Sequence, residues 1–365
     1  AEMAKHMEDD NFKEMGGEKL AEMAKHMEDD NFKDLGGEHI AHMAMNMEGD
    51  NFKEMGGEHI AHMAMNMEGD NFKDLGGQKL AEMAKHMEDD NFKEMGGEKL
   101  AEMAMNMEGD NFKEMGGEHI AHMAKNMEGD NFKDLGGEHI AHMAMNMEGD
   151  NFKEMGGEHI AHMAMNMEGD NFKDLGGQKL AEMAKNMEGD NFKDLGGNKV
   201  VLMAKEMDKN MIGQIGNQQA KGMTKAMEGD HLSTLESDQL VSLAKGIESK
   251  EIVEIGDDRL YAMVNTIKHD DVSSLGENHL SSMMSGIRGT QIGQLEEAKR
   301  VSIVDNLQAN FFGSDKAAFK GIEDTSNKET RPTISEGKVG KTKIASAEKT
   351  TGIFGREGLF ESKVD

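Results

Sequence analysis

The sequence predicts an all-α protein, an α-solenoid of 20-residue tandem repeats with an irregular C-terminal tail. The pattern of residues 1–20 recurs in near-identical units to residue 200 and in degenerate units, without insertion, to about residue 310. This gives about fifteen units, each consisting of two helices. Apolar residues recur at helical spacing in every unit, and glycines and capping residues interrupt them at constant places.

The first helix of each unit is predicted over a span such as 18–27. Leu20, Met23, Ala24 and Met27 fall at i, i+3, i+4 and i+7, which is one stripe of an α-helix. Degenerate units carry Leu, Ile or Val where the first units carry Met or Phe, so methionine is interpreted as an ordinary core residue. A Gly-Gly pair precedes this helix.

A second, much shorter helix is predicted from residue 51 to residue 55. Asn51 and Glu54 match a capping box, and Phe52 and Met55 share the inner side. We expect Gly49 to end the preceding helix in a left-handed conformation and Gly56 to close the short helix.

Neither helix is long enough to be stable alone in water, so the units must stack, each contacting only its neighbours. A parallel β-solenoid is the alternative, since the length of the repeat is also close to that of one β-coil. The 3.6-residue period and the richness in Ala, Met, Glu and Lys favour helices.

Composition divides the chain into three zones. Residues 1–200 hold the near-identical repeats, residues 201–320 the degenerate repeats and a C-terminal cap, and residues 321–365 an extended or disordered polar tail. Phe354 and Phe360 in this tail are candidate docking residues for a neighbouring subunit.

The formal net charge of −30 argues against nucleic acid or an anionic membrane surface as a partner. Zero cysteines exclude disulfides and thiolate chemistry, and no apolar run is long enough for membrane insertion. No nucleophile with a catalytic partner is found, and the carboxylates recur in every unit instead of converging on one site. The sequence therefore indicates a protein that is not an enzyme.

Paired histidines are the candidate metal ligands. Five pairs occur at i, i+3, and in several units a methionine follows three residues later, a pattern suited to copper or zinc if adjacent units stack into a ladder. The candidates are His39, His42, His59, His62, His119, His122, His139, His142, His159 and His162. Other units carry a Lys/Glu pair at these positions, so the alternative is a polar surface, solvated or between subunits, that tolerates either pair.

Five methionines replace lysine on the face away from the core stripe, and we expect them to pack between protomers: Met45, Met65, Met105, Met145 and Met165. The acidic corner Glu48-Gly49-Asp50-Asn51 could bind Ca²⁺, but helix capping alone explains it.

The predicted function is a non-enzymatic structural protein whose copies assemble into a filament, fibre or stalk, outside the cell, on a cell surface or on a virion. It needs no cofactor, and its principal partner is itself. The first alternative is an array that binds or buffers a divalent cation or copper, and the second is a scaffold that binds other proteins.

Overall fold

The computed structural model describes residues 4–309, and all regular secondary structure in this part is helical. The α-solenoid prediction is confirmed. The chain forms two compact units, Ala1–Ile247 and Glu248–Asp365. The predicted tail over 321–365, with Phe354 and Phe360, lies outside the described residues.

The first unit alternates long and short helices. The long helices run over Gly17–Ala24 (α2), Gly37–Met45 (α4), Gly57–Met65 (α6), Gly77–Ala84 (α8), Gly97–Met105 (α10), Gly117–Lys125 (α12), Gly137–Met145 (α14), Gly157–Met165 (α16), Gly197–Glu206 (α19), Asn217–Ala226 (α21) and Ser237–Gly246 (α23).

The short helices of this unit run over Asp9–Met15 (α1), Asp29–Leu35 (α3), Gly49–Met55 (α5), Gly69–Leu75 (α7), Asp89–Met95 (α9), Gly109–Met115 (α11), Gly129–Leu135 (α13), Gly149–Met155 (α15), Gly189–Leu195 (α18), Lys209–Ile212 (α20) and Gly229–Leu232 (α22). A 3₁₀ turn, η1, spans Ala4–His6. In α17 (Gly169–Lys185) a short and a long helix run together across a kink at Gly176.

The short helix begins earlier than predicted. Glu48 is the N-cap of α5, Gly49 is its first residue, and Asn51 accepts a hydrogen bond from the Glu48 amide at 2.8 Å. The capping box is therefore real but starts at Glu48, and the prediction that Asn51 opens this helix was wrong. Gly49 does not adopt the left-handed conformation that was predicted for it. The acidic corner thus serves as a helix cap.

The two glycines of each Gly-Gly pair are needed for different reasons. Gly56 has φ +85°, a conformation that side-chain-bearing residues rarely adopt. A Cβ on Gly57 would overlap Asn91 Oδ1 and lie 2.8 Å from the His86 carbonyl oxygen. The second glycine is therefore required by close packing against a later segment of the chain.

Within the first unit, helices pack against the third helix before them and the third after them, when α17 is counted as one short and one long helix. For example, α12 lies between α9 and α15. One coil of the solenoid therefore holds three helices, which is one and a half sequence repeats. The prediction that a repeat contacts only its neighbours was wrong, because Asn126 bonds Asp89, two repeats earlier.

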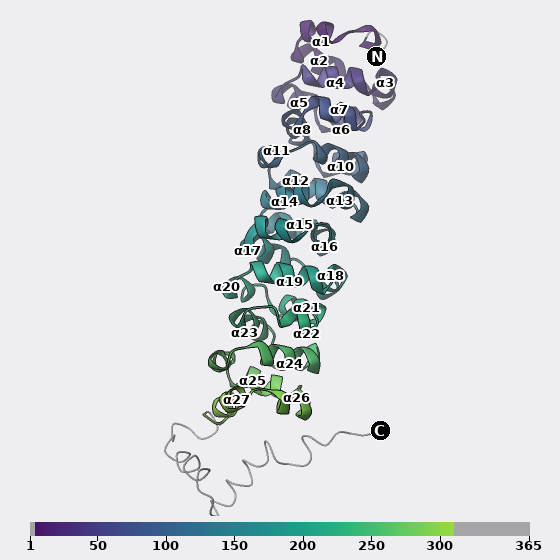
Figure 1. Ribbon diagram of the computed structural model, residues 1–365. Helices are drawn as coiled ribbons and strands as arrows, with labels where there is room; N and C mark the ends of the chain where they lie inside the picture. Colours follow the sequence, from purple (N-terminus) through teal and green to yellow (C-terminus); the bar gives the residue numbers. More distant parts are fainter. Residues whose placement is uncertain (1–3, 310–365) are drawn as a thin grey trace, which may run out of the picture. The chain divides into compact units, whose positions relative to one another are not determined.

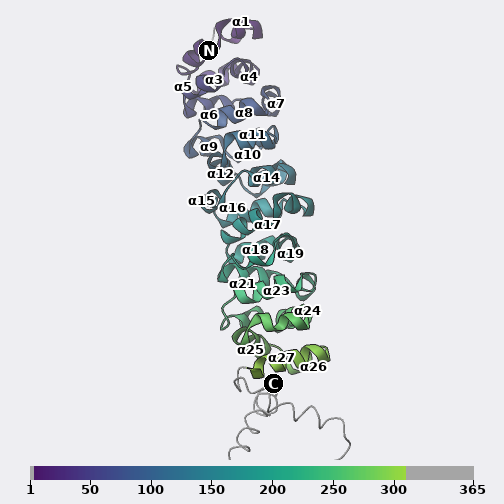
Figure 2. The same ribbon diagram turned by 90° about the vertical axis from the view of Figure 1, so that its left-hand side faces the viewer.

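The three helices of each coil generate three columns of alternating long and short helices along the first unit. One column contains α4, α7, α10, α13 and α16, which lie one below another in Figure 1. In the view turned by 90°, the helices again lie across the direction of stacking (Figure 2). Equivalent long helices of one column, such as α4 and α10, are three sequence repeats apart, with a short helix between them.

The core runs through these coils and consists of the residues predicted from the apolar stripe. The phenylalanines from Phe12 to Phe192 have no exposed surface, and Leu20, Ala24 and Met27 are buried. Met23 is half-buried, but Met43, which occupies the same place in the next long helix, is fully buried.

The second compact unit continues the alternation in degenerate form. Its helices are η2 (Ile252–Ile255), α24 (Asp257–Thr266), η3 (His269–Leu275), α25 (Glu277–Ser285), α26 (Gly289–Gln294) and α27 (Glu297–Ala309). Within it, α25 packs on η2 and α27 packs on η3, again one coil apart.

Candidate functional site

The positions predicted to carry candidate metal ligands lie where one coil contacts the next. In several repeats these positions carry lysine or glutamine in place of histidine. Lys99 donates from Nζ to the main-chain oxygen of Met67 at 2.6 Å and pairs with Glu102 at 3.2 Å. Lys79, Lys179 and Lys199 make the same main-chain bond to the previous coil, and Gln239 donates to the Met207 oxygen at 2.7 Å. The i, i+3 ion pair was predicted, whereas the bond to the previous coil was not.

The paired histidines occupy these same positions. In three pairs the two rings lie 6.4 Å apart, edge to face: His59/His62, His119/His122 and His159/His162. The side chains of His62 and His122 are only 15% exposed. His62 and His122 are therefore largely covered between coils. The predicted polar surface, solvated or between subunits, that tolerates either pair stays a prediction.

The first histidine of a pair bonds the main chain. His119 Nδ1 lies 3.1 Å from the Met115 oxygen, and His159 Nδ1 lies 3.2 Å from the Met155 oxygen. Burial lowers the pKa of both His119 and His159 below the usual imidazole value of 6.5. These rings are therefore held neutral near pH 7.

The second histidine faces an acidic side chain of the next coil. His122 Nε2 lies 3.0 Å from Glu154 Oε1, and His62 Nε2 lies 3.6 Å from Glu94 Oε1. The buried Nδ1 atoms of His62, His122 and His162 have no hydrogen-bond partner in the described part of the chain.

The other two pairs have different surroundings. His39 meets the ring of Phe12 edge to face at 6.4 Å. His142 lines a cavity of about 260 Å³ together with Met145 and Asp174. His42 and His139 are half-buried on the same helices.

The geometry does not support the predicted metal ladder. Consecutive long helices belong to different columns, so His/Met sets of adjacent repeats do not stack on one another. Among residues 4–309, no group of three or more His, Asp or Glu side chains could hold a metal ion. Metal binding at the ten histidines stays a prediction.

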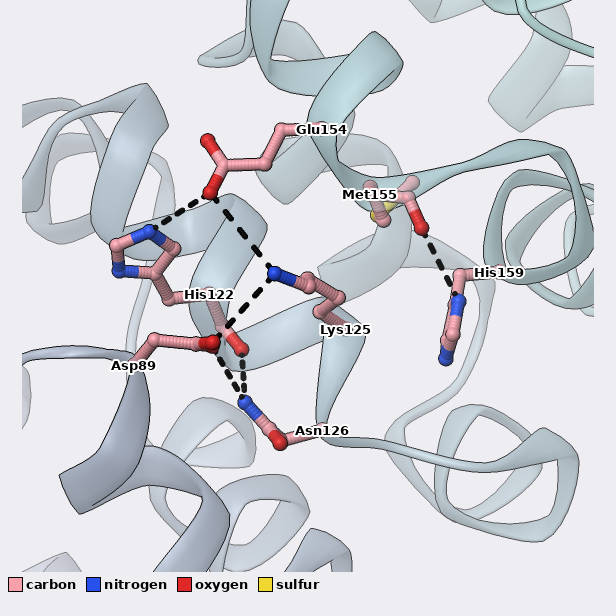
Figure 3. Close-up of polar contacts among 7 residues, drawn as sticks. All are labelled: Asp89, His122, Lys125, Asn126, Glu154, Met155 and His159. Carbon is pink, nitrogen blue, oxygen red and sulfur yellow. Dashed lines mark hydrogen bonds and ion pairs between the residues drawn. The ribbon is translucent and has the colours of Figure 1, made fainter.

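A polar cluster around Lys125 shows how two neighbouring coils are joined (Figure 3). Lys125 Nζ lies 3.4 Å from Asp89 Oδ2 and 3.9 Å from Glu154 Oε1. Asn126 donates to Asp89 Oδ1 at 3.0 Å. The lysine ammonium therefore sits between carboxylates that come from short helices on either side of α12.

The same lysine position recurs in other repeats. Lys5 lies 3.8 Å from Asp34, Lys25 lies 2.9 Å from Glu54, and Lys85 lies 3.7 Å from Glu114. Each of these carboxylates follows its lysine at the same distance along the sequence, as Glu154 follows Lys125.

The five candidate contact methionines occupy this lysine position. Met105 is 38% exposed, and Met45, Met65, Met145 and Met165 are half-buried. The corresponding carboxylates are Asp74, Glu94, Asp134, Asp174 and Asp194, none of which has a lysine partner in the described part of the chain. The structure thus shows a relationship that the sequence alone did not reveal. Each of these methionines occupies the position of a lysine, and the carboxylate that such a lysine would pair with has no lysine partner within the residues that the structure describes.

Comparisons with known proteins assign no family. No family model matches the chain, and no curated protein matches it. A solved structure described as "Computational Design of Self-Assembling Cyclic Protein Homooligomers" is similar at 13% identity, over 88% of this chain and 98% of that one. Its TM-score of 0.13 is too low to carry an argument about fold or function. No helix within residues 4–309 has the length and apolar character needed to cross a bilayer.

Proposed function

We propose that the protein is a non-enzymatic structural scaffold whose copies assemble end to end into a filament, fibre or stalk. The observation that carries this proposal is that one set of contacts recurs from coil to coil in the repeats. The bond from Lys99 to Met67 recurs at Lys79 and Lys179, and the pair Lys125–Glu154 recurs at Lys25 and Lys85.

Because the contacts repeat, the upper surface of one coil is complementary to the lower surface of another. Such an interface is heterologous, and heterologous interfaces that do not close into a ring generate open filaments. Two copies can therefore use between them the interface that each uses within itself.

Negative-stain electron microscopy and sedimentation velocity of the full chain test this proposal. The expected result is particles longer than one chain, whose proportion rises with protein concentration and with salt that screens the −30 charge. Monomers alone, at every concentration and ionic strength, would contradict assembly.

A second candidate, a scaffold that binds other proteins, is favoured by a specific observation. Within residues 1–200, the methionines that replace lysine are unevenly distributed among the three columns of helices, since one column carries methionine in each of its long helices.

A further inference from the structure

In the near-identical repeats, one column of the first unit always carries methionine at the position of Lys25, Lys85 and Lys125. The other two columns most often carry lysine at this position. We define the Met column as α4, α7, α10, α13, α16 and α18, which pack in that order. Its long helices α4, α10 and α16 place Met45, Met105 and Met165 at the lysine position. Within residues 1–200, the long helices carry Lys25, Lys85 and Met145 at this position in the second column, and Met65, Lys125 and Lys185 in the third. In the degenerate repeats of the first unit the position is lysine in all three columns, including Lys225 of α21, which packs on α18.

The short helices of the Met column place an exposed aspartate after each methionine. Asp74 lies in α7, Asp134 in α13 and Asp194 in α18, each at the place where a lysine's partner would lie. No ion pair to these three carboxylates exists among residues 4–309. In the other columns the matching carboxylates Glu54, Glu114 and Glu154 are paired with a lysine of the chain itself.

The Met column therefore presents thioethers and unneutralised carboxylates alternately, coil after coil. A lysine side chain satisfies both groups elsewhere in the chain, since its aliphatic stem packs and its ammonium pairs. At the methionine positions of this face no lysine supplies an aliphatic stem or an ammonium group. Both groups would have to be supplied by a partner molecule. We propose that the Met column is a docking surface for a basic amphipathic helix of another protein.

The Met column of a second copy does not fit this face. The chain carries a net charge of −30, so two Met columns facing each other would bring like charges together. A partner with apolar and basic residues side by side is complementary in both properties. Methionine is suited to such a surface because its flexible, polarisable side chain adapts to different apolar partners.

The spacing of the sites predicts the spacing in the partner. Met45, Met105 and Met165 recur every second coil, and packed helices lie about 8 to 10 Å apart. Two coils then span about 16 to 20 Å, or about 11 to 13 residues of an α-helix. Within this range, a spacing of about 11 residues is close to three full turns, so basic-apolar pairs placed at that spacing lie on one side of the partner helix.

The test is fluorescence anisotropy of a labelled synthetic helix with the full-length protein. The probe is an Ala/Gln helix with three Leu-Lys pairs spaced about 11 residues apart, and a peptide of the same composition in scrambled order is its control. The test variant combines Met45→Lys and Met105→Lys. The matched control combines Met65→Lys and Met145→Lys, which adds the same charge to the other two columns. Lysine occupies this position naturally in other repeats, so both variants should fold, and circular dichroism confirms that they do.

The ordered probe should bind saturably and more tightly than the scrambled peptide. The Met45→Lys/Met105→Lys variant should bind it about tenfold or more weakly, and the control variant within about twofold of the original chain. Equal loss in both variants would show a general charge effect and overturn the proposal, as would absence of binding. Self-association that only Met45→Lys/Met105→Lys abolishes, without peptide binding, would assign the face to a second copy and also overturn it. Because the proposal does not require end-to-end assembly, its failure and that of the filament can be told apart.

Discussion

Lys99 Nζ and the carbonyl oxygen of Met67 are 2.6 Å apart, although 32 residues separate them in the chain. The carbonyl belongs to the segment that leaves α6, and the lysine belongs to α10. A cation placed near the carboxyl end of a helix satisfies free carbonyl groups and interacts favourably with the helix dipole. This bond joins two coils, so it belongs to the interface that builds the solenoid.

Replacing Lys99 with Met should lower the free energy of unfolding by about 1 to 2 kcal/mol, because a half-buried carbonyl loses its charged donor. Urea denaturation followed by circular dichroism measures this change. Lys19→Met is the matched control, since Lys19 is exposed and makes no hydrogen bond in the described structure. Equal effects of the two substitutions would show that the bond to Met67 contributes nothing.

Gly57→Ala should destabilise the chain by about 2 kcal/mol or more, because the new methyl group overlaps Asn91 and the His86 carbonyl, which is main chain and cannot turn away. Gly49→Ala is the comparison, since no atom lies within 4 Å of its Cβ and its φ is not positive. That substitution should be neutral or stabilising by up to about 1 kcal/mol. Thermal unfolding of both variants checks the difference, and similar melting temperatures would rule out the close approach at Gly57.

Phe112→Ala should cost about 3 to 5 kcal/mol, because Phe112 is fully buried and the cavity cannot fill. Phe112→Leu should cost only about 1 kcal/mol. Leu232 occupies the corresponding place in a degenerate repeat, where it is also fully buried. Chemical denaturation of the two variants measures the costs, and a Phe112→Leu variant as unstable as Phe112→Ala would contradict the interpretation of this position as generically apolar.

The free energy of unfolding should fall as the pH drops through 6.5. Burial lowers the pKa of His119 and His159 in the folded chain. As the pH falls, the unfolded chain therefore binds these protons before the folded chain does, and protonation stabilises the unfolded chain relative to the folded chain. Around these rings, Glu118 and Glu158 oppose the shift, while Lys85 and Lys125 reinforce it. The contribution is fully present above pH 6.5 and declines until the pH passes below the folded pKa values.

Replacing both histidines with Gln tests this dependence. Gln219 and Gln239 occupy the same position in later repeats and donate to the end of a helix in the previous coil. The double variant should therefore fold and should lose stability less steeply between pH 7 and about pH 5 than the original chain. An unchanged slope would assign the acid sensitivity to other groups.

Much of the fold follows from the sequence, because a repeated stripe such as Leu20, Ala24 and Met27 can be satisfied only by helices that bury one side. The boundary at Glu48 was missed because Asp50 and Asn51 are preferred N-cap residues and glutamate is not, and only the hydrogen bond from the Glu48 amide to Asn51 identifies Glu48 as the cap. The three-helix coil could not be predicted, since a repeat of two helices gives no information about how many helices complete a turn.

The candidate site shows the same limit. The histidine and methionine positions were found from their deviation from the Lys/Glu pattern, but their partners lie far along the chain, as in Lys25–Glu54 and Asn126–Asp89. Pairing at such separations depends on the number of residues per coil. Once the number of residues per coil is known, the carboxylate that faces each lysine can be assigned. The repeats that carry lysine can then be compared with the repeats that carry methionine at the same position.

The mismatch between a repeat of two helices and a coil of three helices has a genetic consequence. Recombination between near-identical repeats readily adds or removes whole copies. Loss of one copy would leave every coil intact but rotate all that follows by two thirds of a turn, moving Met105 and Met165 out of line with Met45. Only gains or losses of three copies keep the alignment. Selection for the Met column would therefore appear as length variants that differ by multiples of three repeats, whereas selection for length alone would allow steps of a single repeat.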